Sequence, residues 1–213
     1  MNTLVSNAAI ALRPIDAVRD RLASGSLKVG PTLATLVVVL FACNALLFQA
    51  QTFFWDAWAV GGGGKNPLTG HPLLSDFARY MSLAATTFAP LGSVALLPRA
   101  VFMPIGREAV MSAVFVTLTA SSFYTLMAFG LAYYVGGLVV LVQPPELLLD
   151  YLPNPHSLVA VVLALFAIIW LCVAVRVLDL SWFSTLVVGT VFCGMSWGIY
   201  WLYFEYVSTA LRA

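Results

Sequence analysis

Charged residues are scarce in this sequence. Lysine, arginine, aspartate and glutamate together make up 9% of the 213 residues, whereas a typical soluble domain contains roughly 25%. Hydrophobic residues make up 62%, and the mean hydropathy is +0.96. A soluble domain of this length could not bury that much apolar surface. The composition therefore excludes a soluble domain and predicts an integral membrane protein surrounded by the lipid bilayer.

The residues that usually mark metal, catalytic or nucleic-acid sites are few as well. The net charge is +1, so no bulk electrostatic field points to nucleic acid as a partner. No hydrolase, kinase or metalloprotease motif occurs, and neither the cysteines nor the histidines are clustered as metal ligands would be. We therefore expect no enzyme activity, no catalytic residue, no cofactor and no metal. The cysteines and histidines are Cys43, Cys172, Cys193, His71 and His156.

Long runs without charge predict the membrane-spanning helices, because a span needs about 20 mainly apolar residues. The sequence predicts an all-α fold, a polytopic membrane helical bundle, with a cytoplasmic segment at 1–30 and a transmembrane domain at 31–213. In the third run, Gly136 and Gly137 are expected to end or bend the helix, which leaves 136–156 re-entrant, interfacial or outside the membrane. The five spans are expected at about 31–54, 80–98, 107–135, 157–175 and 180–204.

A turn has to divide the last two spans. A single helix over 157–204 would be ~72 Å long at 1.5 Å per residue, far longer than a hydrocarbon core of ~30 Å. Arg176 and Asp179 are the only charged residues in that stretch, and we expect the turn between them. Two interpretations of the pair stay open: a marker of topology at a wet turn, or an ion pair with a function.

Residues 14–24 have the pattern of a short amphipathic helix. Pro14 suits the first turn, and Gly25 suits the stop. Ile15, Val18 and Leu22 share one face, while the charged residues lie on other faces. We expect this helix to lie on the cytoplasmic surface of the membrane, and docking onto a partner is the alternative.

Basic residues predict the orientation, because they are concentrated in cytoplasmic segments. A cytoplasmic N-terminus places more basic residues inside than outside, and five spans then place the C-terminus in the periplasm. The inner residues would be Arg13, Arg19, Arg21, Lys28, Arg99, Arg107 and Arg176, and the outer ones Lys65, Arg79 and Arg212.

No ionisable residue falls at the centre of a predicted span, where such residues commonly mark a proton or ion path. The deepest polar side chains are neutral, and amides there should seek interhelical hydrogen bonds. Serines and threonines of the third span favour close helix packing, with a polar path for a solute as the alternative; they include Thr117, Thr119, Ser121 and Ser122. The candidate functional polar residues are Asn44, Gln49, Arg107, Glu108, Arg176 and Asp179.

Several segments also carry a resemblance to known proteins. They are Arg13-Pro14, VRDRL, Gly25, Lys28 and Pro31 before the first span, NALLFQAQ at the end of that span, NPLTGHPL in the linker after it, Glu108, and AVRVLDLSWFSTL. Together they resemble a family of uncharacterised bacterial multi-span inner-membrane proteins, which implies the bacterial inner (plasma) membrane and supplies no mechanism. This chain departs from the family in lacking an N-terminal zinc ribbon and histidines after Glu108, and in having Leu178-Asp179 where the family often has Tyr-Gly. The architecture alone is also similar to Yip-type membrane proteins.

These observations favour a non-enzymatic accessory or scaffold subunit that packs against other membrane proteins. A transporter or channel for a small or lipidic solute, lined by Asn44, Gln49 and the hydroxyl side chains, is the alternative. The least favoured interpretation is a membrane enzyme that uses the two charged pairs at the cytoplasmic interface.

Overall fold

The computed structural model describes residues 10–61, 96–103, 105–142 and 155–202, and every secondary-structure element in these ranges is helical. The four longest helices are apolar enough to cross a membrane, α6 being counted from Ser157. The all-helical class and the membrane character are confirmed in this part of the chain, while residues 80–95 of the predicted second span lie outside it. The elements are α2 (Pro14–Ala23), α3 (Val29–Val60), the 3-10 helix η2 (Arg99–Phe102), α5 (Arg107–Val140), α6 (Pro155–Arg176) and α7 (Trp182–Leu202).

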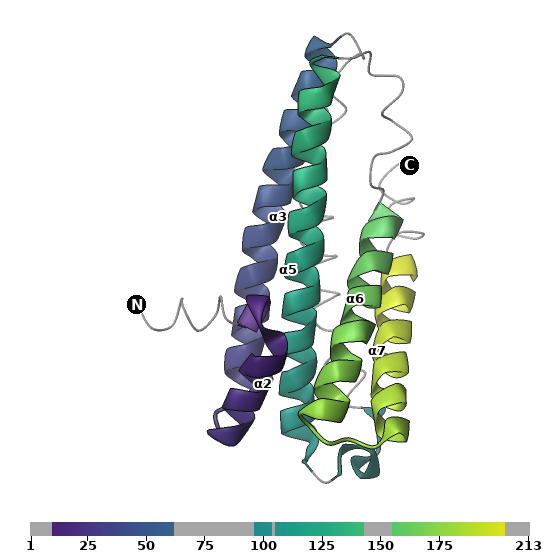
Figure 1. Cartoon of the computed structure of the whole chain (residues 1–213). Coiled ribbons are helices and arrows are strands. Elements are labelled where there is room, and N and C mark those ends of the chain that lie inside the picture. Colours follow the sequence, from purple (N-terminus) through teal and green to yellow (C-terminus); the bar gives the residue numbers. More distant parts are fainter. Residues whose placement is uncertain (1–9, 62–95, 104, 143–154, 203–213) are drawn as a thin grey trace.

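Helix α5 lies in the middle of the described bundle. It contacts α3 on one side and α6 on the other, and α6 in turn contacts α7 (Figure 1). Helices α3 and α5 run in the same direction, α6 returns, and α7 runs parallel to α5 (Figure 1). The end of α3 accordingly meets the end of α5, where a Cβ added to Gly61 would lie 3.2 Å from the carbonyl oxygen of Val140.

The helices fall into two length classes. Helices α3 and α5 contain 32 and 34 residues, which corresponds to ~48 and ~51 Å. Helices α6 and α7 contain 22 and 21 residues, or ~32 Å each, which matches a hydrocarbon core of ~30 Å. The start of α5 and the turn between α6 and α7 lie at the same end of the bundle. The longer α3–α5 pair therefore extends beyond α6 and α7 at the other end (Figure 1).

The expectation that Gly136 and Gly137 end or bend the third span was wrong. Helix α5 continues through both glycines to Val140. A Cβ on Gly137 would lie 2.7 Å from the ring of Phe53 and 3.3 Å from the Cα of Phe54, so α3 occupies the space that a side chain would need. The glycines serve close helix packing, as small residues do in membrane helices, and this packing keeps α5 helical.

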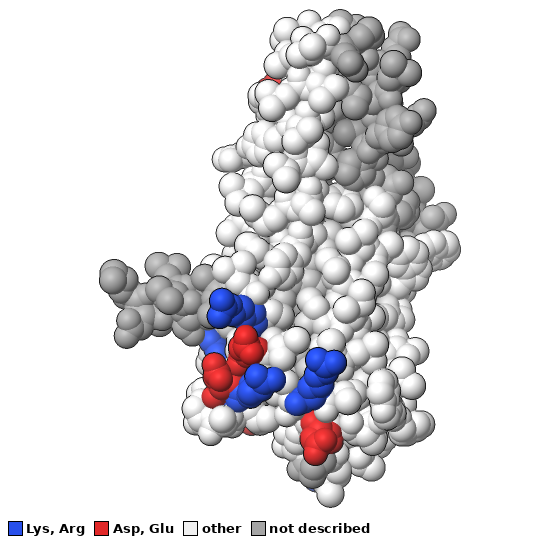
Figure 2. All heavy atoms as spheres, viewed as in Figure 1, with Lys and Arg blue, Asp and Glu red and all other residues white. Residues whose placement is uncertain are grey.

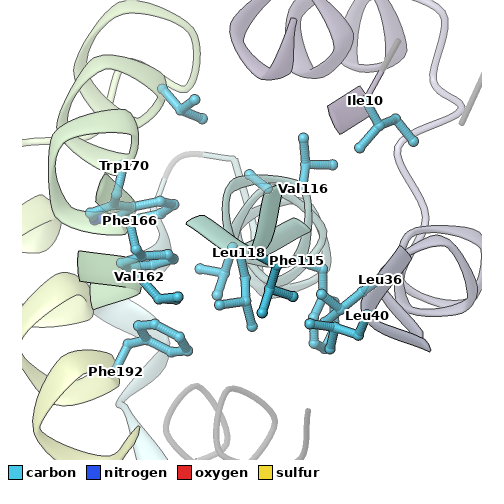
Figure 3. Packing of buried hydrophobic residues seen from close by; sticks show 14 of the residues in the cluster. Ile10, Leu36, Leu40, Phe115, Val116, Leu118, Val162, Phe166, Trp170 and Phe192 are labelled. Atoms are coloured by element: carbon cyan, nitrogen blue, oxygen red, sulfur yellow. The ribbon is translucent and has the colours of Figure 1, made fainter. Parts of the chain in front are cut away.

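Large side chains fill the centre of the bundle. Figure 3 shows Phe115 of α5 beside Leu36 and Leu40 of α3, while Leu118 faces the α6 side. There the ring of Phe166 lies between Phe192 of α7 and Trp170, with ring centroids 4.1 and 6.2 Å away respectively. All residues from Ser112 to Ser122 of α5 are buried, so this half of the helix is enclosed on every face.

Helix α2 has the predicted ends and the predicted apolar face, and this face packs against other helices of the chain. Gly25 adopts φ +65° just after the helix, as a terminating glycine should. The apolar face packs against α5 and α6, and Val18 is fully buried. The Tyr124 hydroxyl donates a hydrogen bond to the Leu12 carbonyl at 2.8 Å, which fixes the start of this segment against α5. Burial against the chain's own helices removes the apolar face from water.

Candidate functional site

Charged side chains gather on one half of the bundle, over α2 and the turn between α6 and α7 (Figure 2). The basic residues of the described part are Arg13, Arg19, Arg21, Lys28, Arg99, Arg107 and Arg176, all on elements at the end where α3 and α5 begin. Partial burial lowers the pKa of Arg21, and the guanidinium still remains charged at neutral pH. Arg19 and Asp16 form an exposed ion pair at 3.4 Å, a kind of contact worth ~0–1 kcal/mol.

Arg107 holds the connection that leads into α5. Its guanidinium donates to the Leu97 carbonyl at 2.9 Å and lies 5.5 Å from the centre of the buried Phe102 ring. Glu108 is exposed beside it in the first turn of the helix, where a carboxylate is favoured by the helix dipole. These contacts give Arg107 a structural task at the start of α5.

Arg176 and Asp179 flank the predicted turn, and both are exposed. Helix α6 ends at Arg176, and Asp179 adopts φ +51°, a left-handed conformation that reverses the chain without glycine. The Leu180 amide then donates to the Ala174 carbonyl at 3.0 Å, which closes the turn. Within the described residues no ion pair joins Arg176 to Asp179. Asp179 has left the helix, so the i, i+3 pairing geometry does not apply.

Ser181 lies at the start of α7, and its capping role was not assigned from the sequence. The Ser181 hydroxyl accepts a hydrogen bond from the Ser184 amide at 3.1 Å, which is the usual N-cap arrangement. A serine three residues before a second hydroxyl, at the start of an apolar run, was the available signal. Asp179 and Ser181 together explain how a tight turn forms here without glycine or proline.

Asn44 and Gln49 do not meet. The Asn44 amide donates to the Leu40 carbonyl of its own helix at 2.9 Å, and its side chain is half-buried. Gln49 is exposed and lies ~140° further around α3. The two amides therefore do not line a single polar path in this arrangement.

Buried hydroxyls are the other polar feature of the interior. Thr119, Ser121 and Thr125 of α5 donate to carbonyl groups of their own helix at 2.7, 3.1 and 2.8 Å. Such bonds satisfy the hydroxyl without reaching another helix. Four buried hydroxyls have no hydrogen-bond partner among the described residues: Ser112, Thr117, Thr185 and Ser196. The last two and Ser112 were not singled out from the sequence.

No group of three potential metal ligands occurs within the described ranges. No family model, no curated protein and no solved structure matches the chain. The positions of the residues themselves therefore carry any functional argument.

Proposed function

We propose that this chain is a multi-pass protein of the bacterial inner membrane that acts without enzymatic chemistry, as an accessory or scaffold subunit of a membrane protein assembly. The proposal is supported chiefly by where the charges lie. Every charged side chain of the described part is exposed, apart from a half-buried Arg21 on α2. Proton and ion paths usually require ionisable groups inside the bundle, so helix packing is the activity that this interior favours.

The packing surface is large. The α3–α5 pair is ~50 Å long, about 20 Å more than the hydrocarbon core, and it carries exposed large apolar side chains from Val38 onward on α3 and from Tyr124 onward on α5. Because lipid tails offer no hydrophobic driving force for helix association, such faces pair through close packing and polar contacts. A subunit that joins other membrane proteins would use faces of this kind.

Gentle extraction in detergent followed by native-gel and mass analysis tests the function. We expect other membrane proteins to accompany the chain in stoichiometric amounts. Recovery of the chain alone, with no other membrane protein, would contradict an accessory role.

A topology of five spans with a cytoplasmic N-terminus belongs to the same proposal. Gly61 lies beside Val140 at one end of the bundle, while Leu97 lies beside Arg107 at the other. The chain between 61 and 96 therefore joins opposite ends, which supports one more crossing than the four described helices. The gathering of the described basic residues at the α2 end supports the cytoplasm on that side.

A transporter or channel is the second candidate, favoured by the four buried hydroxyls without partners. In a polar path, Thr117→Val would reduce solute flux in reconstituted vesicles and leave thermal stability intact. In a packing role, the same substitution would change stability alone.

A further inference from the structure

The outward face of α3 is unused within the described part of the chain. We infer that this face, centred on Ala42, Ala45 and Gln49, packs against the same face of a second copy of the chain. The inference rests on the proposed function, because it names one partner through which an assembly subunit would use its helices.

The two sides of α3 differ clearly. Leu40, Leu47 and Ala50 are buried on the side that meets α5. Ala42, Ala45 and Gln49 are exposed, and Gln49 lies ~160° around the helix from Leu47. The residues on the outward face are thus left uncovered by the described helices.

The Gln49 side chain is polar, and its exposure to lipid without a hydrogen-bond partner is energetically unfavourable. The charge-free run of α3 extends over 29–55, and a hydrocarbon core of ~30 Å centred on it covers about 20 residues, or roughly 32–52. Gln49 falls inside that zone, and no hydrogen bond joins it to another described residue, unlike Asn44. An amide exposed to hydrocarbon without a partner costs several kcal/mol in apolar solvent, so a partner that can both donate and accept would be strongly favoured.

A second copy supplies such a partner at the right depth. The bilayer gives all copies one orientation, so a twofold axis along the membrane normal places each α3 residue opposite its own counterpart. A glutamine side chain carries both donors and acceptors, and Gln49 can therefore pair with Gln49. Ala42 and Ala45 allow the two backbones to approach closely, as small residues do at such crossings. Asp56 lies ~10 Å further along the helix, where crossing helices have begun to separate.

Oxidative cross-linking in native membranes tests the inference. The native cysteines are first replaced by alanine, and single cysteines are introduced as Ala45→Cys and Gln49→Cys. The matched control is Ile168→Cys, which is 61% exposed on α6 and reports random collisions. We expect at least five times more covalent dimer from the two α3 positions than from the control. In addition, Gln49→Leu should weaken self-association about 3- to 15-fold, the range that interhelical hydrogen bonds in membranes support.

Two results would overturn the inference: cross-linking at Ile168→Cys equal to that at Ala45→Cys, or a cross-link from α3 to a different protein. If dimer is absent and other membrane proteins still accompany the chain in stoichiometric amounts, the inference fails and the proposed function stands. A monomer without any companion would overturn both.

Discussion

Single residues set the local geometry at two places that the sequence leaves ambiguous. Asp179 supplies a left-handed residue at the α6–α7 turn, and Gly137 supplies the space into which Phe53 packs. In both cases the residue type matters through backbone geometry or volume.

Substitution of Asp179 should separate a turn residue from an ion-pair residue. Asp179→Gly should leave the thermal stability in detergent unchanged or raise it, because glycine adopts φ > 0 without steric cost. Asp179→Ala should lower the free energy of unfolding by about 1 kcal/mol, because alanine keeps a Cβ that is strained in this conformation and loses the short polar side chain that can hydrogen-bond locally there. Arg176→Ala is the control, and its effect should add to that of Asp179→Ala within ~0.5 kcal/mol. A larger coupling energy between the two substitutions, together with loss of function at normal membrane insertion, would favour the interpretation of Arg176 and Asp179 as a functional ion pair.

Gly137→Ala should destabilise the α3–α5 pair. The new Cβ would stand 2.7 Å from the ring of Phe53 and 3.3 Å from the Cα of Phe54, and overpacking of this kind costs about 1–3 kcal/mol. The melting temperature in detergent measures the effect. Gly130→Ala is the matched control on the same helix, since nothing lies within 4 Å of its added Cβ, and it should retain or raise stability. Equal losses for both would show that the close approach at Gly137 is unimportant.

At the scale of elements, side-chain contacts join helices that are separate segments of the sequence. Trp170 of α6 donates its indole N–H to the Thr185 carbonyl of α7 at 3.0 Å. Gly189 provides the room for that ring, since its added Cβ would lie 3.1 Å from Trp170. Helix α2 is attached to α5 and α6 in a similar way, through Val18 and the bond between Tyr124 and Leu12.

Val18→Asp should release α2 from the bundle. A carboxylate cannot be buried there without a partner, so the helix should detach while the apolar helices remain folded. Limited trypsin digestion of the detergent-solubilised protein measures this as faster cleavage at Arg19, Arg21 and Lys28. Ala23→Asp, at an exposed position of the same helix, should leave the cleavage rate unchanged. Unchanged cleavage of the Val18 variant would mean that α2 is held by other contacts.

At the scale of the whole molecule, the proposed topology predicts which described positions share a side of the membrane. In a cysteine-free background, Val60→Cys and Val142→Cys should react with a membrane-impermeant maleimide on intact cells. Ser26→Cys and Ala100→Cys should react only after permeabilisation, because both would be cytoplasmic. If Ala100→Cys and Val60→Cys both reacted on intact cells, the two positions would lie on the same side of the membrane, which would contradict five spans.

The amino-acid sequence by itself determined the membrane class, the helical class, the turn near Arg176 and the two faces of α2. These properties depend on hydrophobic transfer and on helix periodicity within short windows, so each can be derived locally. The tertiary structure alone decided that Gly136 and Gly137 pack instead of breaking α5, that α2 lies on α5 and α6, and that Gln49 faces outward while Asn44 bonds to its own helix. Each of these depends on which side chain lies across a helix interface, and neighbours across an interface are far apart in sequence.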